Sequence, residues 1–185
     1  KYTPESIDKC FVGFGRKTAG IVEEIVFKAR GHKTVMIFGA TVAHCKEIMA
    51  SLPPEISRMI DGTTPKKERE QIIKDTKELK VRYLVSCETL TTGVDIESVS
   101  IIAILRATLS PVLITQIIGR SLRLYPGKKE ALILDYTTTN IDHFFPDGDL
   151  CSPTLKVSKG KQSSESIIAK CELCRTENEF SARPN

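Results

Sequence analysis

The sequence predicts an α/β fold in which helices cover both faces of a parallel β-sheet. Short apolar runs alternate along the chain with longer segments of helical periodicity. The runs are apolar at nearly every position, which is typical of strands that are buried on both faces. Glycine, proline and helix-capping residues separate the strand-like runs from the helical segments. These three observations predict strand–helix units that are wound into a single sheet.

The first predicted elements are a leading helix, a buried strand and a second helix. Apolar side chains recur at helical spacing between residues 17 and 30. Residues 34–38 then form an apolar run that ends at Gly39, as expected of a covered strand. Thr41 can cap the next helix, whose apolar face continues until the proline pair at 53–54. This segment is therefore one strand–helix unit.

The strand–helix pattern repeats further along the chain. Residues 56–60 indicate a strand, and the following turn offers Thr64 as a helix cap with Pro65 at the first helical position. A charged helix should follow. Three more apolar strands are expected at residues 81–86, 99–105 and 131–134. In such sheets ligands bind at the carboxyl ends of strands, which here are residues 39–41, 86–95 and 106 onward.

Size and composition are those of one globular domain with an appended tail. The chain has 185 residues, 41% of them hydrophobic and 27% charged, which excludes a disordered protein. No apolar run approaches the roughly 20 residues of a membrane span, so a cytoplasmic protein without a membrane partner is expected. We predict a linker over residues 1–16, a domain over 17–146 and a flexible tail over 147–185. The net charge of +4 permits a phosphate-rich partner without demanding one.

Residues 116–123, Gln-Ile-Ile-Gly-Arg-Ser-Leu-Arg, carry the strongest chemical signal, on a helix that Ser110 and Pro111 are expected to start. On a helix, Gln116, Arg120 and Arg123 would fall within a sector of roughly 60°. Isoleucines and a leucine would occupy the opposite side, and Gly119 would let a ligand approach closely. Because guanidinium groups grip phosphate oxygens in pairs, this face predicts a polyphosphate site. The alternative interpretation is an ordinary amphipathic helix with exposed arginines.

Residues 90–95, Leu-Thr-Thr-Gly-Val-Asp, directly follow the strand predicted at 81–86. Hydroxyl groups, a glycine that exposes backbone amides and a carboxylate suit contacts to a nucleotide sugar and to nucleic-acid phosphate. A glycine-containing turn in which Asp95 caps the next element is the alternative, and such turns are common. By itself this segment is therefore weak evidence for a nucleotide site, and it counts only together with residues 116–123.

Four segments, in this order and spacing, resemble the C-terminal lobe of superfamily-two helicases. The resemblance covers about residues 33 to 136 and implies a RecA-like fold of the P-loop NTPase type, with three layers. It is greatest to the bacterial DNA-repair members of the superfamily. The segments are residues 33–41 for motif IV, 61–70 for the turn and charged helix, 85–95 for motif V and 116–123 for the QxxGRxxR form of motif VI.

The resemblance implies a role for each matching residue. Arg120 and Arg123 would be arginine fingers that stabilise the transferred phosphoryl group of ATP. Nucleotide contacts are implied for Gln116, Gly119, Gly93 and Asp95. Contacts to nucleic-acid backbone phosphates are inferred for three hydroxyl groups near strand ends or helix N-termini, those of Thr41, Thr63 and Thr91. Two departures are Cys87, where many relatives carry threonine, and Gln116 in place of histidine.

The sequence contains neither a GxxxxGK[ST] phosphate loop nor a DExx box. Residues 13–18 resemble a phosphate loop, but Arg16 interrupts the required Gly-Lys junction and no apolar strand leads into it. ATP and Mg²⁺ should therefore be held mainly by an N-terminal RecA-like lobe of the same polypeptide. The present chain alone is expected to be inactive as an ATPase.

Cys171-Glu-Leu-Cys174 has the spacing of half a zinc knuckle. Tetrahedral zinc needs four ligands, and the other four cysteines sit in or beside other elements. We expect half a metal site in the tail, with zinc possible in a longer protein.

Three functions remain open. The first is a bacterial ATP-driven helicase or translocase on DNA, with DNA-repair proteins as possible partners. The second is the motor lobe of a type I or type III restriction enzyme, which a nuclease or methylase partner would favour. The third is a non-enzymatic nucleic-acid-binding module, which phosphate binding insensitive to Arg120 or Arg123 would favour.

Overall fold

The computed structural model describes most of the predicted domain and two strands of the tail. The described residues are 13, 15–87, 95–108, 110–137, 141 and 145, together with the backbone of 166–170 and 177–181. The chain divides into two compact units, Lys1–Thr154 and Leu155–Asn185. Each unit is described by itself below.

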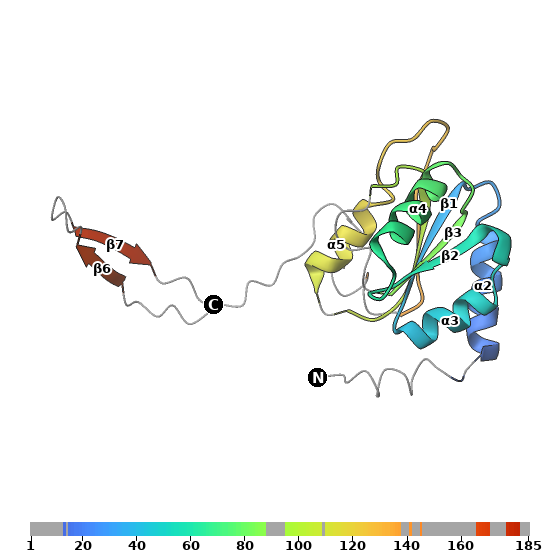
Figure 1. The fold of residues 1–185 in the computed structure, drawn as a ribbon, viewed down its shortest axis with the longest axis horizontal. Helices are drawn as coiled ribbons and strands as arrows, with labels where there is room; N and C mark the ends of the chain where they lie inside the picture. Colours follow the sequence, from blue (N-terminus) through green and yellow to red (C-terminus); the bar gives the residue numbers. More distant parts are fainter. Residues whose placement is uncertain are drawn as a thin grey trace. The chain divides into compact units, whose positions relative to one another are not determined.

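The first unit contains a five-stranded sheet whose strands all run parallel. The strand order is β2-β3-β1-β4-β5, so β1 lies at the centre and pairs with both β3 and β4 (Figure 1). The predicted parallel α/β sheet is thus confirmed. The strands are β1 Thr34–Gly39, β2 Ser57–Ile60, β3 Tyr83–Ser86, β4 Val99–Leu105 and β5 Leu132–Asp135.

Two pairs of helices cover the two faces of this sheet (Figure 1). The central strand shows why, because its successive side chains point to opposite faces. Val35 and Ile37 belong to a core with side chains of α2 and α3, whereas Met36 and Phe38 belong to a core with α4 and α5. The helices are α2 Gly15–Lys28, α3 Val42–Ala50, α4 Lys66–Lys77 and α5 Pro111–Gly119.

Helix boundaries confirm the predicted cap of α3 and correct the predicted cap of α4. Thr41 caps α3 as predicted, and its hydroxyl accepts a hydrogen bond from the amide of His44 at 3.2 Å. At α4 the prediction was wrong, because Pro65 is the N-cap residue and the helix begins at Lys66. The hydroxyl of Thr64 is directed to Asp61 instead, at 3.1 Å from the carboxylate.

The second unit holds an antiparallel strand pair that sequence analysis did not predict. β6 Ser166–Lys170 pairs with β7 Glu177–Ser181, and Lys170 lies opposite Glu177. These residues fall in the region expected to be a flexible tail. Isolated two-stranded pairs are weakly specified by local pattern, because a single hairpin is marginal by itself.

Within the described part of the chain, every helix is too short or too polar to span a lipid bilayer.

Candidate nucleotide and nucleic-acid sites

Helix α5 begins and packs as the sequence predicts. The Ser110 hydroxyl accepts a hydrogen bond from the amide of Leu113 at 3.3 Å, and Pro111 occupies the first turn. Ile114, Ile117 and Ile118 are buried in the core on this face of the sheet. The apolar half of the predicted helix therefore anchors the segment that carries the two arginines.

The arginine half of the prediction is only partly right, because α5 ends at Gly119. Arg120 is the C-cap residue, and residues 120–122 form a turn. Ser121 becomes fully buried there, and its hydroxyl donates to the carbonyl of Ile118 at 2.8 Å. Leu122, expected in the core, is 52% exposed. The two arginines therefore do not share one helical flank, although Gln116 and Gly119 are exposed as predicted.

Arg120 lies mostly inside the protein. Its residue surface is only 8% exposed, and burial lowers the pKa of its guanidinium from the ordinary value. A guanidinium in this position keeps its charge because arginine deprotonates only far above neutral pH. Its charge therefore acts from a buried position. A buried charge suits fixed electrostatic stabilisation better than a flexible surface contact does.

Arg123 lies beyond the helix and forms an ion pair with Asp95. The two residues belong to the two predicted nucleotide segments, 116–123 and 90–95, which the fold brings into contact. The side chains are 40% and 62% exposed, respectively. An ion pair this exposed contributes little stability, about 0–1 kcal/mol. Arg123 can therefore exchange the carboxylate for a phosphate group at small cost.

The Arg123–Asp95 pair lies at the amino edge of the sheet, opposite to the edge that was predicted. Asp95 lines a cavity of about 230 Å³ together with Ser98, which immediately precedes β4, and Lys77, which ends α4 before β3. Tyr125 also lines it. The reason is topological: a parallel strand must start at the amino edge, so the chain has already crossed back when it reaches Asp95.

The carboxyl edge holds Thr41, as predicted. It follows β1 at the start of α3, where Gly39 permits a close approach of the helix: a Cβ atom on Gly39 would lie 2.4 Å from Cys45 Sγ. Nearby, the amide of Ala40 donates to His44 Nδ1 at 3.3 Å, and burial lowers the pKa of His44. The Thr41 hydroxyl is half-buried and already serves as the helix cap.

Thr63 is exposed, but its proton is directed to a carboxylate. Its hydroxyl donates to Asp61 Oδ1 at 2.7 Å, and its amide donates to the same oxygen at 2.8 Å. These bonds, led by the Thr63 hydroxyl, lower the pKa of Asp61. A phosphate contact from Thr63 would require this hydroxyl to change partner, because phosphate only accepts hydrogen bonds at neutral pH.

Four predicted site residues lie outside the described residues: Gly93, Thr91, Cys171 and Cys174. The predicted half zinc site therefore stays a prediction. Within the described ranges, no group of three or more histidine, cysteine or acidic side chains is placed to hold a metal ion.

One anchored loop was not anticipated. Lys33, just before β1, donates from Nζ to the carbonyl of Pro126 at 3.1 Å and lies over the Tyr125 ring at 4.6 Å from its centroid. Lys128 donates from Nζ to the carbonyl of Arg123 at 2.8 Å. The loop that carries Arg123 is thus held from both sides. The Pro-Gly turn signal at 126–127 was available in the sequence, but its distant partner Lys33 was not.

The chain belongs to the family described as the helicase conserved C-terminal domain. That family matches residues 17–125, which is more than half of the chain. The family match spans both nucleotide segments and the first four strands of the sheet, so this chain contains the C-terminal RecA-like lobe of a superfamily-two helicase.

Two sequence relatives match this chain over different lengths. The first is irc3 of Schizosaccharomyces pombe, by name a mitochondrial ATP-dependent helicase, which is 46% identical over 80 residues, or 43% of this chain and 13% of that protein. A 51.5 kDa protein of a Lactococcus phage (isolate 7-9) is 29% identical over 153 residues, or 79% of this chain and 32% of that protein. The chain thus spans a third or less of the length of these relatives.

Solved structures share the fold. A fragment assigned to the HsdR subunit of a type I restriction enzyme from Vibrio vulnificus YJ016 aligns with a TM-score of 0.65 at 21% identity, over 78% of this chain and 31% of that one. The C-terminal domain of the DEAD-box protein Dbp5 aligns with a TM-score of 0.60 at 22% identity, over 71% of this chain and 80% of that one. At these identities the likeness defines the fold alone.

Proposed function

We propose that this lobe completes the ATP site of a DNA helicase or translocase. In this proposal the phosphates of ATP, held with Mg²⁺ by an N-terminal lobe, face Arg123 and Arg120, and the sugar faces Asp95. The observation that carries the proposal is the contact between Arg123 and Asp95, because it joins the two nucleotide segments at one exposed point. The amino edge of the sheet is then the face turned toward the other lobe.

The two arginines have different tasks in this scheme. Arg123 is exposed enough to leave Asp95 and contact the γ-phosphate, whereas Arg120 is buried and supplies a fixed positive charge behind it. A finger of this kind typically accounts for a rate factor on the order of 10³ to 10⁵. Bound nucleotide would take over the carboxylate's place beside Arg123 and leave Asp95 available to the sugar hydroxyls.

The nucleic acid would contact the opposite, carboxyl edge. Thr41 lies there at the N-terminus of α3, where backbone amides suit phosphate binding. Thr63 and Thr91 are the other proposed contacts to nucleic acid, and Gly93, Gln116 and Gly119 are the other proposed contacts to the nucleotide. In this proposal the nucleic-acid track, meaning the set of contacts at the carboxyl edge, and the ATP site lie at different edges of the sheet. Movement between the lobes that is driven by ATP would then shift these nucleic-acid contacts.

The decisive test is steady-state ATPase activity of the polypeptide that contains both lobes, in the presence of DNA. Arg123→Ala should lower kcat by about 10³-fold while nucleotide affinity falls much less. Arg120→Ala should also lower kcat, because it removes the fixed positive charge behind Arg123. Arg16→Ala, an exposed arginine on α2, is the matched control and should leave kcat unchanged.

Asp95→Asn separates a finger from a structural ion pair. If Arg123 served only as the partner of Asp95, then Asp95→Asn and Arg123→Ala would have equal effects on kcat. The proposal instead expects Asp95→Asn to act mainly on KM for ATP. Unchanged turnover in both arginine variants, with normal folding, would exclude the finger assignment.

We further propose a role in DNA repair for this chain, in a bacterial cytoplasm, alone or with repair proteins. This proposal rests on a resemblance that we infer from the sequence motifs to RadD, also called YejH, a bacterial DNA-repair helicase-like protein. The segments that carry it are residues 35–42, 90–95, 101–106 and 124–136. Sensitivity of a strain to DNA damage after deletion of the full gene, rescued by wild type but not by Arg123→Ala, would test it.

A type I or type III restriction motor is the second candidate, because a fragment assigned to such an enzyme shares this fold. A nuclease domain in the full polypeptide, or a methylase encoded beside it, would decide for this function. A non-enzymatic nucleic-acid-binding module is the remaining alternative, and it predicts DNA binding without any ATPase activity.

A further inference from the structure

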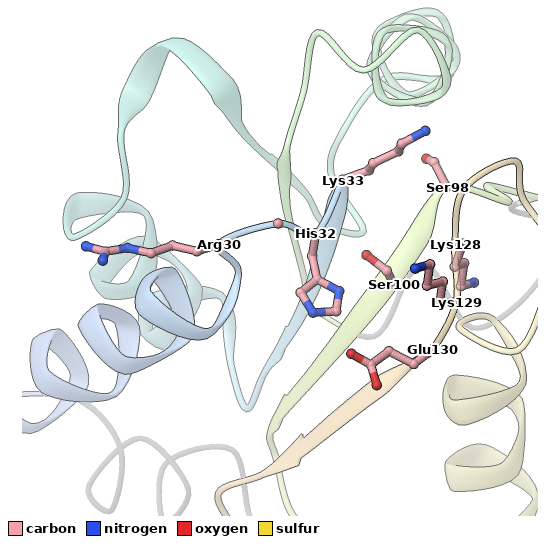
Figure 2. Close-up of a pocket in the computed structure, with 10 residues that line it drawn as sticks. Arg30, His32, Lys33, Ser98, Ser100, Lys128, Lys129 and Glu130 are labelled. Carbon is pink, nitrogen blue, oxygen red and sulfur yellow. The ribbon is translucent and has the colours of Figure 1, made fainter.

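A second cavity opens at the amino edge of the sheet, beside the one that contains Asp95. It has a volume of about 370 Å³ and lies where three strands begin. Residues 30–33 lead into β1, Ser98 and Ser100 flank the start of β4, and residues 127–130 lead into β5 (Figure 2). Nothing in the proposed ATP site uses these residues.

A tight turn builds one wall of this cavity. The amide of Lys128 donates to the carbonyl of Tyr125 at 3.0 Å, and Gly127 has a φ of +78°. Proline at the second and glycine at the third position are the signature of a type II turn, which needs a positive φ at the third residue. Lys33 holds this turn through the carbonyl of Pro126 at 3.1 Å. The wall is therefore preformed.

The floor consists of hydroxyl groups at an irregularity in the sheet. The pairing between β1 and β4 shifts there: Thr34 lies opposite Val99, but Val35 lies opposite Ile101. Ser100 is the extra residue, and its hydroxyl lies 3.4 Å from the carbonyl of Thr34. The hydroxyls of Thr34 and Ser98 lie 2.9 Å apart. Such bulges often occur next to functional sites.

The charge of the lining is strongly positive. The four basic residues around the cavity are Arg30, Lys33, Lys128 and Lys129, and the one carboxylate is that of Glu130. Among the described residues, none of these four bases forms an ion pair with a carboxylate. Figure 2 shows Arg30 turned away from the others, whereas Lys128 and Lys129 lie beside Ser100.

The two better-fixed lysines are held by neutral groups. Lys33 and Lys128 contact carbonyl oxygens, which orient an ammonium group without neutralising it. Partial burial lowers the pKa of Lys128, as expected for a cation that is desolvated without an opposite charge. An anion in the cavity would supply that missing charge. His32, half-buried on the opposite wall, offers a further donor.

We propose that this cavity binds a phosphate group of a small phosphorylated compound, at a site separate from the Arg123–Asp95 pair. Lys128 and Lys129 supply the charge, and the imidazole of His32 supplies a hydrogen bond. A concave site of this size is near the lower end of small-ligand pockets. A continuous nucleic-acid strand would instead need an open groove that tracks its backbone.

The test is a titration of the ¹⁵N-labelled chain with inorganic pyrophosphate at constant ionic strength, followed by amide chemical shifts. Saturable shifts are expected at residues 31–33, 98–100 and 127–130. Lys129→Glu should raise the dissociation constant for pyrophosphate by about fivefold or more, as expected when one exposed charge is reversed. Lys67→Glu, the same charge change on an exposed residue of α4, should leave it unchanged.

Two further experiments test whether pyrophosphate binds in this cavity and whether the cavity also binds a nucleic-acid strand. In the Arg123→Ala variant, pyrophosphate should still change the amide chemical shifts of residues 127–130, because the proposed ATP site does not cause these changes. An oligothymidylate should not displace pyrophosphate from these residues. Unsaturable shifts, equal weakening by Lys129→Glu and Lys67→Glu, or displacement by the oligonucleotide would each overturn the proposal.

Discussion

At the scale of single residues, the carboxyl edge of the sheet depends on a glycine whose place no larger residue can take without a clash. Gly39 ends the central strand where α3 packs against it, and Cys45 Sγ fills the space that a side chain would need. Burial, with the nearby Cys87 as a second cause, raises the pKa of Cys45 to about 12. Its thiol is therefore a packing group at neutral pH, and not a nucleophile.

Gly39→Ala should lower the free energy of unfolding by about 1–3 kcal/mol, because the added methyl group would overlap Cys45 Sγ and crowd Ile48 Cδ1. Urea denaturation followed by circular dichroism measures this change. Gly20→Ala is the matched control: no atom lies within 4 Å of the added Cβ, in the middle of α2. That change should be neutral or stabilise by about 0.5–1 kcal/mol. Equal effects of the two substitutions would contradict the close approach.

At the scale of elements, each helix near the site is defined by its ends. α3 starts with a threonine cap at the edge proposed to contact nucleic acid, and α5 ends at Gly119, just before the two arginines. A buried arginine and an exposed one result from a segment that looked like a single helical face. The end of α5 thus leaves Arg120 buried and Arg123 exposed.

Substitutions of Thr41 can separate its capping role from its proposed phosphate contact. Thr41→Ala should cost about 1 kcal/mol of stability, because the amide of His44 loses its acceptor. Thr41→Asp should keep the cap, since aspartate is a favoured N-cap residue, but should repel backbone phosphate. DNA affinity measured by fluorescence anisotropy should therefore fall most for Thr41→Asp, although the thermal midpoint of this variant stays near wild type. Wild-type affinity in this stable variant would remove Thr41 from the track.

At the scale of the whole molecule, the chain separates its two predicted contacts onto opposite edges of one sheet. Thr41 lies at the carboxyl edge, and the Arg123–Asp95 pair lies at the amino edge. The core between them also includes Phe145, which is buried although it lies ten residues beyond the last strand of the sheet, β5 Leu132–Asp135. The first unit therefore needs residues well past β5.

Two truncations test the division into units. A chain ending at Thr154 should unfold at the same urea concentration as the full chain, because the second unit begins at Leu155. A chain ending at residue 140 loses Ile141 and Phe145 from the core and should be less stable by about 3–5 kcal/mol. Equal stability of the two truncated chains would show that Phe145 is not part of the folded core. A large loss in the longer one would contradict independent units.

Local pattern determined the elements of this protein and its family-defining motifs. Apolar runs predicted the five parallel strands, and Thr41 and Ser110 identified the starts of α3 and α5. These features depend on neighbours a few residues away, so side-chain periodicity and capping chemistry report them directly. The antiparallel pair β6–β7 escaped prediction, since its pairing joins residues whose local pattern is weak.

Tertiary structure alone decided where the chemistry lies. The sequence by itself identified Arg120, Arg123 and Asp95, but only packing ends α5 at Gly119, buries Arg120 and places the Arg123–Asp95 pair at the amino edge. The cavity between Lys33 and Lys128 likewise joins strand starts that are far apart in the chain. The physical reason is that a helix end, a sheet edge and a charged cavity depend on which distant segments compete for the same space, and no local spacing encodes that.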